Sequence, residues 1–357
     1  MNKRIALTFK ENGENGGPFT SHKRIQDSAL NNKYDFIPLT IPRARVLLKP
    51  SGMMTFVKKI KDCQVGAVQI AGLQLDGILT LYACKKAGVK SIVAIHGRMT
   101  ESPSIKGLRR VFYEVGEKWT VNNADVSFGV SDYVGSWKIC NDAPKYFGTV
   151  YNLPPKTHPL DTRLREQTRK RLGFKETDIV FISTGRITEE KGFDTLGKAI
   201  ENINPKLHVK FLIVGDGSYL QSWKKEVCVN GYSDRVVFVG YQKNVDVFLN
   251  AADAFIICSK HETLCISLLE AAMHRLPLIG SDVGGIPEII NDKDGILVPV
   301  NDVAGFSHVI ELLADDAQKR TALGQAAFEY VTSKFNEVDI LQKLDDIYTM
   351  VLKDEIE

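Results

Sequence analysis

The sequence predicts an α/β protein built from two Rossmann-like, doubly wound domains that face a central cleft. Its 357 residues exceed what a single hydrophobic core usually serves. Short apolar runs alternate with longer helix-like stretches, which is typical of parallel sheets assembled from βαβ units. Three prolines in residues 152–159 break this alternation once, so that the segment is the expected linker.

The expected strands are short and rich in β-branched residues, as in sheets that are buried on both faces. In the first half they fall at residues 4–9, 34–38, 65–70, 91–95, 126–130 and 148–151. In the second half they fall at residues 179–184, 209–214, 236–239, 254–258 and 277–280.

Three helices matter for the organisation: a charged one at 160–172, one at 264–273, and a tail helix at 336–352 with helical apolar spacing. We therefore expect an N-terminal Rossmann-like domain at 1–155 and a C-terminal Rossmann-like domain at 156–335. The helix within 336–357 is expected to pack back on the first domain. In such sheets a ligand binds at the carboxyl ends of the strands.

Composition indicates a soluble globular protein, with 44% hydrophobic and 25% charged residues. No apolar run approaches the roughly 20 residues that span a bilayer, and the N-terminal apolar segment is too short for a signal peptide. The six cysteines contain no Cys-x-x-Cys pair, which favours reduced core residues over a disulfide or zinc framework. A cytoplasmic location is expected.

Charge is distributed unevenly. Residues 1–155 contain 22 Lys and Arg against 12 Asp and Glu, whereas the remainder contains 24 against 31. This imbalance predicts an anionic ligand or surface for the first half. Because no nucleic-acid-binding motif accompanies it, nucleic acid is not an expected partner.

A candidate phosphate site follows the strand at 179–184. Gly185 permits a turn, and Arg186 and Lys191 then provide a planar fork and a point charge before a helix start. Pairing of both cations with Glu189 and Glu190 on a solvated surface is an equally weighted alternative.

Two glutamates follow the strand at 254–258. Glu262 lies at its carboxyl end, where ligands bind in such sheets. Glu270 lies within the next helix, and Ser267 three residues before it matches a capping box. Taken singly, capping is the favoured explanation for Glu270.

In the first half, Gly16 and Gly17 form a turn before a helix that is expected to begin near residue 19. His96 follows the strand at 91–95, where a histidine is often only hydrogen-bonded structure.

Residues 104–113 interleave Lys106, Arg109 and Arg110 with Phe112 and Tyr113. Such a segment could rest on anionic headgroups. By itself, an ordinary amphipathic helix with exposed cations is favoured; together with the basic first half, it makes peripheral membrane association a hypothesis. The basic character is extended by Arg43, Arg45, Lys49, Lys58, Lys59 and Lys61.

The ordered motifs of the second half resemble the retaining glycosyltransferases of family 4, which have the GT-B fold. They are Gly185-Arg186, Glu190-Lys191-Gly192, Ile213-Val-Gly215-Asp216-Gly217, Phe238-Val-Gly240, Glu262-x7-Glu270 and Asp282-Val-Gly-Gly-Ile-Pro-Glu288. The resemblance covers residues 169–302 and is weaker in the first half.

The resemblance implies that Glu262 contacts the donor sugar, Glu270 the ribose, and Arg186 and Lys191 the diphosphate of a UDP- or GDP-sugar. It implies that His96 faces the cleft and contacts the donor sugar, and that no metal or cofactor is needed. It implies that residues 1–155 bind the acceptor and residues 156–335 the nucleotide sugar. Arg98 and Ser131 are then weaker candidates for acceptor contacts, and Lys106, Arg109 and Arg110 are candidates for contacts with the acceptor or a membrane. Further donor-binding positions are Gly16, Gly17, Gly185, Gly215, Tyr241, Leu264, Cys265 and Ile266. The family usually has Phe-Gly where this chain has Leu264-Cys265, so donor identity is not carried over.

The sequence thus predicts transfer of a hexosyl residue, with retained configuration, to a hydroxyl of a glycan or lipid-linked glycan in cell-surface polysaccharide synthesis. The Asp292-Lys-Asp294 sequence is interpreted as a turn. The alternatives are a nucleotide-sugar epimerase of the same architecture and a non-catalytic sugar- or lipid-binding module. A dehydrogenase is disfavoured because no Gly-x-Gly-x-x-Gly follows the first strand.

Overall fold

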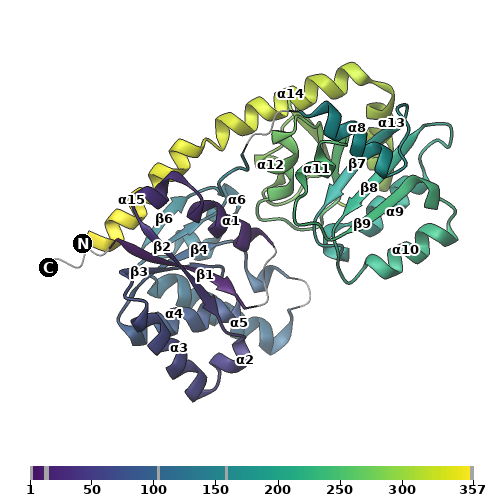
Figure 1. Cartoon of the computed structure of the whole chain (residues 1–357). Coiled ribbons are helices and arrows are strands. Elements are labelled where there is room, and N and C mark those ends of the chain that lie inside the picture. The colour runs from purple at the N-terminus through teal and green to yellow at the C-terminus, as the bar shows by residue number, and fades with distance from the viewer. Residues whose placement is uncertain (1–2, 12–15, 103–104, 157–159, 354–357) are drawn as a thin grey trace. The chain divides into compact units, whose positions relative to one another are not determined.

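The chain folds into two compact α/β units, described here from a computed structural model (Figure 1). The structure describes residues 3–11, 16–102, 105–156 and 160–353. The first unit comprises Met1–Leu153 together with Phe335–Glu357, and the second comprises Pro154–Lys334. The chain therefore leaves the first unit once and returns to it at the end.

The first unit contains a parallel six-stranded sheet of order β2-β1-β3-β4-β5-β6. The strand order reverses beside β1, which is where such sheets open a crevice at the carboxyl edge. The strands are β1 (Arg4–Lys10), β2 (Asp35–Ile41), β3 (Ala67–Ala71), β4 (Lys90–Ile95), β5 (Val126–Gly129) and β6 (Tyr146–Thr149).

Helices cover both faces of this sheet. Neighbouring helices α3, α4 and α5 pack side by side on one face, and α1 and α15 lie on the other (Figure 1). The helices are α1 (Gly17–Gln26), α2 (Ala44–Leu47), α3 (Pro50–Asp62), α4 (Leu75–Ala87), α5 (Gly107–Asn123), α6 (Asp132–Gly135), α7 (Lys138–Asn141) and α15 (Glu337–Lys353), with a 3-10 turn η1 (Ala29–Asn32).

The tail helix α15 is part of the first unit's core. Tyr348 is fully buried, and its hydroxyl donates a hydrogen bond to Gln69 Oε1 at 2.8 Å. Its ring meets that of Tyr34 edge-on at 5.1 Å. Lys33 Nζ and the Tyr34 hydroxyl both contact Asp345, at 2.6 and 2.7 Å. The helical apolar spacing of the tail thus corresponds to a buried face.

The second unit contains a parallel sheet of order β12-β11-β10-β7-β8-β9, whose strand order reverses between β10 and β7. Its strands are β7 (Ile179–Thr184), β8 (Val209–Val214), β9 (Val236–Gly240), β10 (Ala254–Ile257), β11 (Leu278–Ser281) and β12 (Gly295–Val298). The central strands are fully buried because they are apolar on both faces.

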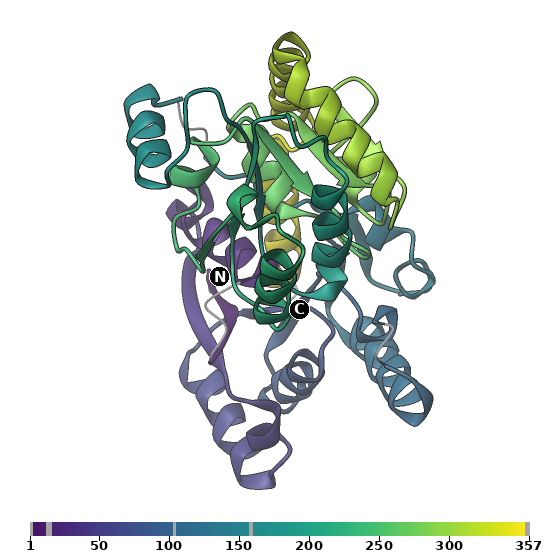
Figure 2. The ribbon, with the colours of Figure 1, turned by 90° about the vertical axis from the view of Figure 1, so that its right-hand side faces the viewer.

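The helices of the second unit complete its α/β layers, and α13 and α14 lie side by side (Figure 2). They are α8 (Thr162–Arg171), α9 (Phe193–Glu201), α10 (Leu220–Val229), α11 (Asp246–Leu249), α12 (Ile266–Met273), α13 (Val303–Asp315) and α14 (Ala317–Lys334), with 3-10 turns η3 (Glu189–Lys191), η4 (Ser233–Arg235) and η5 (Ile286–Glu288).

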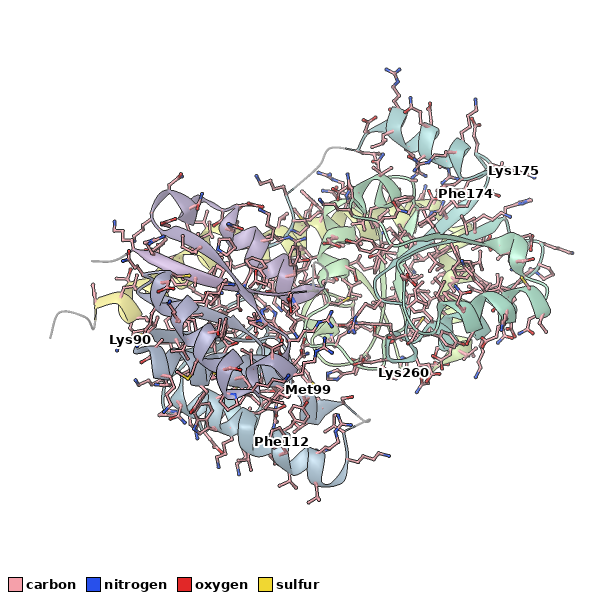
Figure 3. All side chains as sticks on the ribbon, turned by 60° about the horizontal axis from the view of Figure 1, so that its bottom comes forward. Lys90, Met99, Phe112, Phe174, Lys175 and Lys260 are labelled. Atoms are coloured by element: carbon pink, nitrogen blue, oxygen red, sulfur yellow. The ribbon has the colours of Figure 1, made fainter. Side chains whose placement is uncertain are left out.

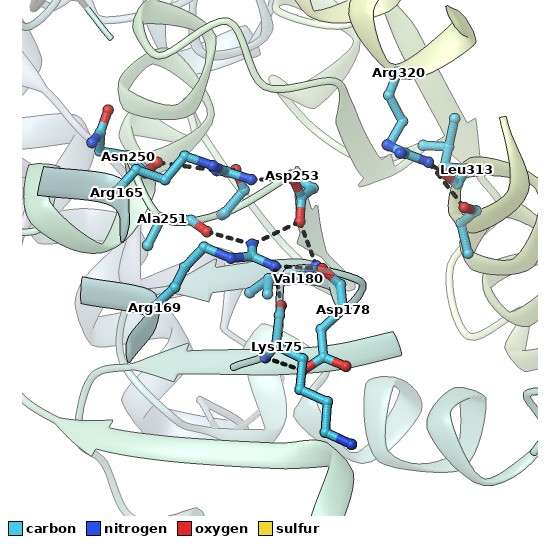
Figure 4. A network of polar contacts seen from close by, with 12 residues as sticks. Arg165, Arg169, Lys175, Asp178, Val180, Asn250, Ala251, Asp253, Leu313 and Arg320 are labelled. Carbon is cyan, nitrogen blue, oxygen red and sulfur yellow. Dashed lines mark hydrogen bonds and ion pairs between the residues drawn. The ribbon is translucent and has the colours of Figure 1, made fainter. Parts of the chain in front are cut away.

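Two arginines attach α8 to the amino ends of β7 and β10. The chain leaves α8 towards Lys175 (Figure 3), whose carbonyl accepts from Arg169 Nη2 at 3.0 Å. Arg165 and Arg169 both pair with Asp253, and the Asp253 carboxylate also accepts from the Val180 amide at 2.7 Å (Figure 4). This network lies at the edge of the sheet opposite the carboxyl ends of its strands, and it orders the start of β7.

Two strand predictions were wrong in detail. Residues 148–151 were expected as a strand, but β6 is Tyr146–Thr149, because the chain has already left the sheet for the proline-rich segment. The strand β12 was not predicted, since its four residues form too short an apolar run after the turn at Asp292 and Asp294. The first helix begins at Gly17 rather than near residue 19. Residues 157–159 of the proposed linker lie outside the described residues.

Candidate active site

The loop after β7 brings Lys191 against the loop after β10. Gly192 has φ +69°, and a Cβ there would lie 1.7 Å from the Cys258 carbonyl oxygen. Only glycine therefore permits this close approach of the two loops. Lys191, one residue earlier, ends η3 and is directed towards the residues that follow β10.

Lys191 and Glu262 form the central ion pair, with 2.6 Å between Nζ and Oε1. The buried Ser259 hydroxyl also donates to this oxygen at 3.0 Å, and Glu262 is only 7% exposed. Burial acts to lower the pKa of Lys191, but the adjacent Glu262 carboxylate outweighs it, so that the net shift is upward. The lysine stays charged, which suits a fixed counter-charge.

The alternative expected for both cations was surface pairing with Glu189 and Glu190. Lys191 pairs with Glu262 instead. Arg186 is exposed on the same loop, and it makes no ion pair with any described residue. Its charge lies close enough to oppose that of Lys191. Two cations, one held and one open to solvent, therefore share this loop.

Glu262 is held by one carboxylate oxygen only. Within the described part of the chain, Oε2 accepts no hydrogen bond, whereas Oε1 receives both Lys191 and Ser259. A sugar hydroxyl could therefore donate to Oε2 without disturbing the ion pair. Ser259 was missed by sequence reasoning, and its only signal was a hydroxyl three residues before the glutamate.

Glycines of the η5 turn support the Glu262 backbone. Gly284 has φ +58°, and a Cβ there would lie 1.8 Å from the Glu262 carbonyl oxygen. The Gly285 amide donates to that same oxygen at 3.1 Å. The glycines of this segment therefore have a structural role, which is to hold the backbone of the loop that carries Glu262. Lys260 further ties the loop to Asp194 of α9 at 2.7 Å.

The loops after β8 and β9 lie beside the loop after β7 that carries Arg186 and Lys191, which we call the cation loop. The Gly215 amide donates to the Gly240 carbonyl at 2.8 Å, and the Gly185 amide donates to the Val214 carbonyl at 3.0 Å. Tyr241, directly after β9, is 53% exposed and is therefore not a packed core aromatic.

The capping box expected for Glu270 is wrong. The N-cap of α12 is Cys265, without a side-chain cap, and Ser267 lies inside the helix. The buried Leu264 and Cys265 bring the chain into the helix earlier than the capping pattern implies. Helix capping therefore does not explain Glu270. This half-buried residue lies in the second turn of α12.

Cys265 is buried at the start of α12, with its Sγ 3.2 Å from Ser267 Oγ. Burial, and then the charge of Glu262, raise the pKa of its thiol to about 12. Its thiol is therefore protonated and uncharged, and it is not a thiolate nucleophile. Ile266, the first helical residue, is half-buried beside it.

In the first unit, His96 directly follows β4. Burial, and then neighbouring His22, lower the pKa of His96 to about 3, which leaves its imidazole neutral at pH 7. Gly16 is the N-cap of α1 with φ 108°, and Gly17 begins the helix. Glu14 and Asn15 of the same turn lie outside the described residues.

The loop after β4 is organised by Glu117 of α5, a residue that sequence reasoning missed. This fully buried carboxylate accepts from Arg98 Nε at 2.9 Å, the Met99 amide at 2.7 Å and the Thr100 hydroxyl at 2.9 Å. Arg98 is therefore committed to this pairing. Ser131 is fully buried and caps α6 through the Val134 amide, which explains it without an acceptor.

Three further expectations concern the surface and the turn. Lys106, Arg109 and Arg110 are exposed at the start of α5, and Ser104 lies outside the described residues. The turn prediction for Asp292 and Asp294 is confirmed, since Asp294 Oδ1 accepts from the Asn291 amide at 2.7 Å within it. In the ranges that the structure describes, no helix combines the length and apolarity needed to cross a membrane.

Comparison with protein families identifies the second unit. Residues 165–330, which carry the ion pair and the glycine loops, match the family described as Glycosyl transferases group 1. The second unit is a group 1 glycosyltransferase domain. The family recognised from its ordered motifs is thus confirmed at the level of the group.

Curated relatives of this glycosyltransferase extend beyond the matched domain. The chain is 29% identical over 279 residues to N-acetyl-alpha-D-glucosaminyl L-malate synthase of Bacillus anthracis, covering 75% of this chain and 69% of the relative. It is 25% identical over 364 residues to the UDP-Gal:alpha-D-GlcNAc-diphosphoundecaprenol alpha-1,3-galactosyltransferase of Escherichia coli, covering 96% and 88%.

Solved structures share the fold of the whole glycosyltransferase. Anabaena HepE, in complex with UDP and glucose, matches with TM-score 0.79 and 16% identity over 98% of this chain and all of that one. Sucrose-phosphate synthase from Thermosynechococcus elongatus matches with TM-score 0.83 and 18% identity over 99% and 100%. The chain has the two-domain α/β fold of GT-B glycosyltransferases, as its sequence predicts.

Proposed function

We propose that the chain is a retaining glycosyltransferase of family 4 that moves a hexosyl residue from a nucleotide-diphosphate sugar to an acceptor hydroxyl. The observation that carries the proposal is the Lys191–Glu262 ion pair beside exposed Arg186, at the carboxyl ends of β7 and β10 in a group 1 domain. Neither an epimerase nor a non-catalytic module is favoured by the relatives.

The cation loop would receive the diphosphate. Lys191 has three N–H donors, so it can keep Glu262 while donating to a phosphate oxygen. Arg186 adds a planar fork, and α9 begins at Phe193 with oriented N–H groups on the same loop. Charge that develops on the leaving diphosphate would meet preorganised positive charge, which is electrostatic stabilisation of the transition state.

The sugar would be held by Glu262 Oε2 and the ribose by Glu270. The side chains of Leu264 and Cys265 would limit the space beside the sugar. The protonated Cys265 thiol supplies no nucleophile. The departing phosphate itself would take the proton of the acceptor hydroxyl, as in a front-face mechanism. The proposal assigns no step to a metal.

We assign the first unit's contribution to His96 as a sugar contact and to Gly16 and Gly17 as donor contacts. A neutral imidazole can donate one hydrogen bond to a sugar hydroxyl and carries no charge that would compete for the diphosphate. Tyr241 and Gly215 are proposed beside the nucleotide.

The acceptor is proposed to be a glycan or a lipid-linked glycan of cell-surface polysaccharide synthesis, presented at the cytoplasmic face of the membrane. Among the relatives, the E. coli enzyme is named for a diphosphoundecaprenol acceptor. A Corynebacterium glutamicum relative, 26% identical over 347 residues, is named for a phosphatidylinositol mannoside acceptor and GDP-mannose.

A donor panel tests the proposal. UDP-, GDP- and ADP-sugars are compared by thermal shift, since a ligand that binds only the folded state raises its stability by mass action. The donor that binds is then incubated with a lipid-linked acceptor, and the anomeric configuration of the product is read by NMR. We expect one base to stabilise the protein and the product to retain configuration.

Three outcomes contradict parts of the proposal. Absence of stabilisation by every nucleotide sugar would refute donor binding. Conversion of the sugar without an acceptor would indicate an epimerase. Inversion of the anomeric carbon would exclude the retaining mechanism.

A further inference from the structure

The outer face of α5 carries an apolar stripe. Leu108, Val111, Phe112 and Val115 are 89%, 56%, 57% and 65% exposed, and their spacing of i, i+3, i+4 and i+7 places them on one side of the helix. On the opposite side, Glu117, Thr120 and Val121 of the carboxyl-terminal half are buried, whereas the residues from 107 to 112 are exposed. Figure 3 labels Phe112 on this helix. Four large apolar side chains gathered on one exposed face are characteristic of an interaction surface.

A second exposed apolar group lies at the same edge of the sheet. Val46, Leu48 and Met54 of the α2–α3 segment are 38%, 62% and 73% exposed. This segment follows β2, as α5 follows the loop after β4, and carboxyl ends of parallel strands share one edge. We call the α5 stripe and this group together the apolar edge of the first unit.

Cations surround the apolar edge. Residues 36–61 contain six Lys and Arg and no Asp or Glu. Near α5 the cations are Lys106, Arg109 and Arg110, against Glu114 as an exposed acid. Arg109 and Arg110 make no ion pair with another described residue, so their charge is available to an anionic partner.

We propose that the apolar edge is a docking surface for an anionic lipid bilayer. Leu108, Val111, Phe112 and Val115 enter the boundary between headgroups and acyl chains, and the surrounding cations bind headgroup phosphates. The charge complementarity is what selects a lipid surface as the occupant. The inference deepens the proposed function and rests on it only for the assumption that the acceptor is membrane-borne.

The same helix connects this surface to the candidate site. Through Glu117, the buried side of α5 holds Arg98, Met99 and Thr100, which directly follow His96. Docking of the outer face would therefore place the loop after β4 next to the bilayer. An acceptor headgroup at the bilayer surface would meet the residues of this loop.

Vesicle flotation of the full chain tests the surface. Vesicles of phosphatidylcholine, with and without phosphatidylglycerol, are compared for wild type, for Arg109→Glu/Arg110→Glu and for Phe112→Ser/Val115→Ser. We expect wild type to bind only the anionic vesicles. Charge reversal should weaken binding at least tenfold, because each cation at an anionic surface contributes about a factor of five. The Phe112→Ser/Val115→Ser substitutions should weaken the part of vesicle binding that persists at high salt.

Matched controls come from the glycosyltransferase domain. Lys206→Glu/Lys225→Glu reverses two exposed cations there, and Val229→Ser removes a side chain that is 82% exposed. Both should bind vesicles like wild type. Vesicle binding that is equal in all variants would overturn the proposal. A changed oligomeric state of Phe112→Ser/Val115→Ser in light scattering, with unchanged vesicle binding, would instead identify a second copy as the occupant.

Failure of this inference is distinguishable from failure of the proposed function. Donor binding is measured in the same variants by thermal shift with the nucleotide sugar. We expect the Phe112→Ser/Val115→Ser protein to keep that shift while losing vesicle binding. Loss of both would show that the substitutions damage the fold, and the single variant Val111→Ser then repeats the vesicle measurement.

Discussion

Lys191 and Glu262 stabilise one another across two loops that are 71 residues apart in the chain. Removing one partner of a largely buried pair leaves the other charge without compensation, which commonly costs about 3–5 kcal/mol. A substitution here would therefore affect folding as well as chemistry. An informative experiment has to separate the two effects.

We predict that Lys191→Ala lowers transfer at least about 100-fold, because a preorganised charge opposite the leaving diphosphate is lost. Glu262→Gln, which keeps the side-chain shape, should also lower transfer strongly. Steady-state transfer is measured at a temperature where circular dichroism shows each variant to be folded.

Lys260→Ala is the control for this pair, since it breaks the neighbouring, more exposed ion pair with Asp194 on the same loop. It should keep most of the activity. Near-wild-type transfer by folded Lys191→Ala and Glu262→Gln would rule out the site assignment.

The sequence pattern identified Glu262 and Lys191 but not their supports. Ser259 and Gly284 act through contacts between loops, and local sequence spacing carries no information on which loops meet. The sequence allowed two interpretations of Arg186 and Lys191: a phosphate site, or surface pairing with Glu189 and Glu190. For Lys191 they could be distinguished only from the position of Glu262 in space. At this scale the candidate site residues Lys191 and Glu262 were predictable from the sequence, whereas the residues that position them were not.

At the scale of elements, strands with continuous apolar runs were predicted well, and helix starts less well. The tail helix expected at 336–352 is observed at Glu337–Lys353, and the helix expected at 264–273 is observed at Ile266–Met273, whereas the capping box expected at Ser267 and Glu270 is absent. A capping box is only a preference of isolated helix ends, and burial of Leu264 and Cys265 overrides it here.

Helix α1 is attached to β1 by a histidine that must stay neutral. The fully buried His22 lies with Nδ1 2.9 Å from the Thr8 carbonyl oxygen. Burial is the larger cause and lowers its pKa to about 4, although the hydrogen bond that the ring makes to the Thr8 carbonyl acts in the opposite direction. The unfolded chain binds a proton near pH 6.5, and the folded chain does so only near pH 4. Stability is therefore lost as the pH falls through this window.

We predict that the free energy of unfolding of the first unit falls between pH 6.5 and pH 4, with His22 responsible for up to about 3 kcal/mol. In His22→Gln this decrease should be smaller, and urea unfolding at a series of pH values measures it. His96 titrates in the same direction and remains in both proteins. Parallel stability curves for wild type and His22→Gln would contradict the assignment.

For the whole molecule, two doubly wound units followed from the alternation of elements and the proline-rich break. The sequence predicted only in part where the tail helix packs, because apolar spacing indicates that one face of the helix is buried but not which unit covers it. The structure answers this with Tyr348, Asp345 and their partners Gln69 and Tyr34 in the first unit.

We predict that Tyr348→Ala destabilises the first unit by about 3–5 kcal/mol, since it removes a fully buried aromatic side chain. Tyr348→Phe keeps the ring and loses only the hydrogen bond to Gln69, so it should cost about 1–3 kcal/mol. Urea unfolding of the three proteins checks the order. Equal midpoints for wild type and Tyr348→Ala would show that the tail does not contribute to this core.

The return of the chain at Phe335 also determines how this enzyme can be recombined. A chimera that exchanges the first unit with that of a relative must carry residues 1–153 and 335–357 from the same parent, or Tyr348 will meet a foreign partner at position 69. A single crossover within the linker would thus join two folded halves and still damage one of them. Two crossovers, at both connections, would exchange the first unit whole while the second unit stays intact.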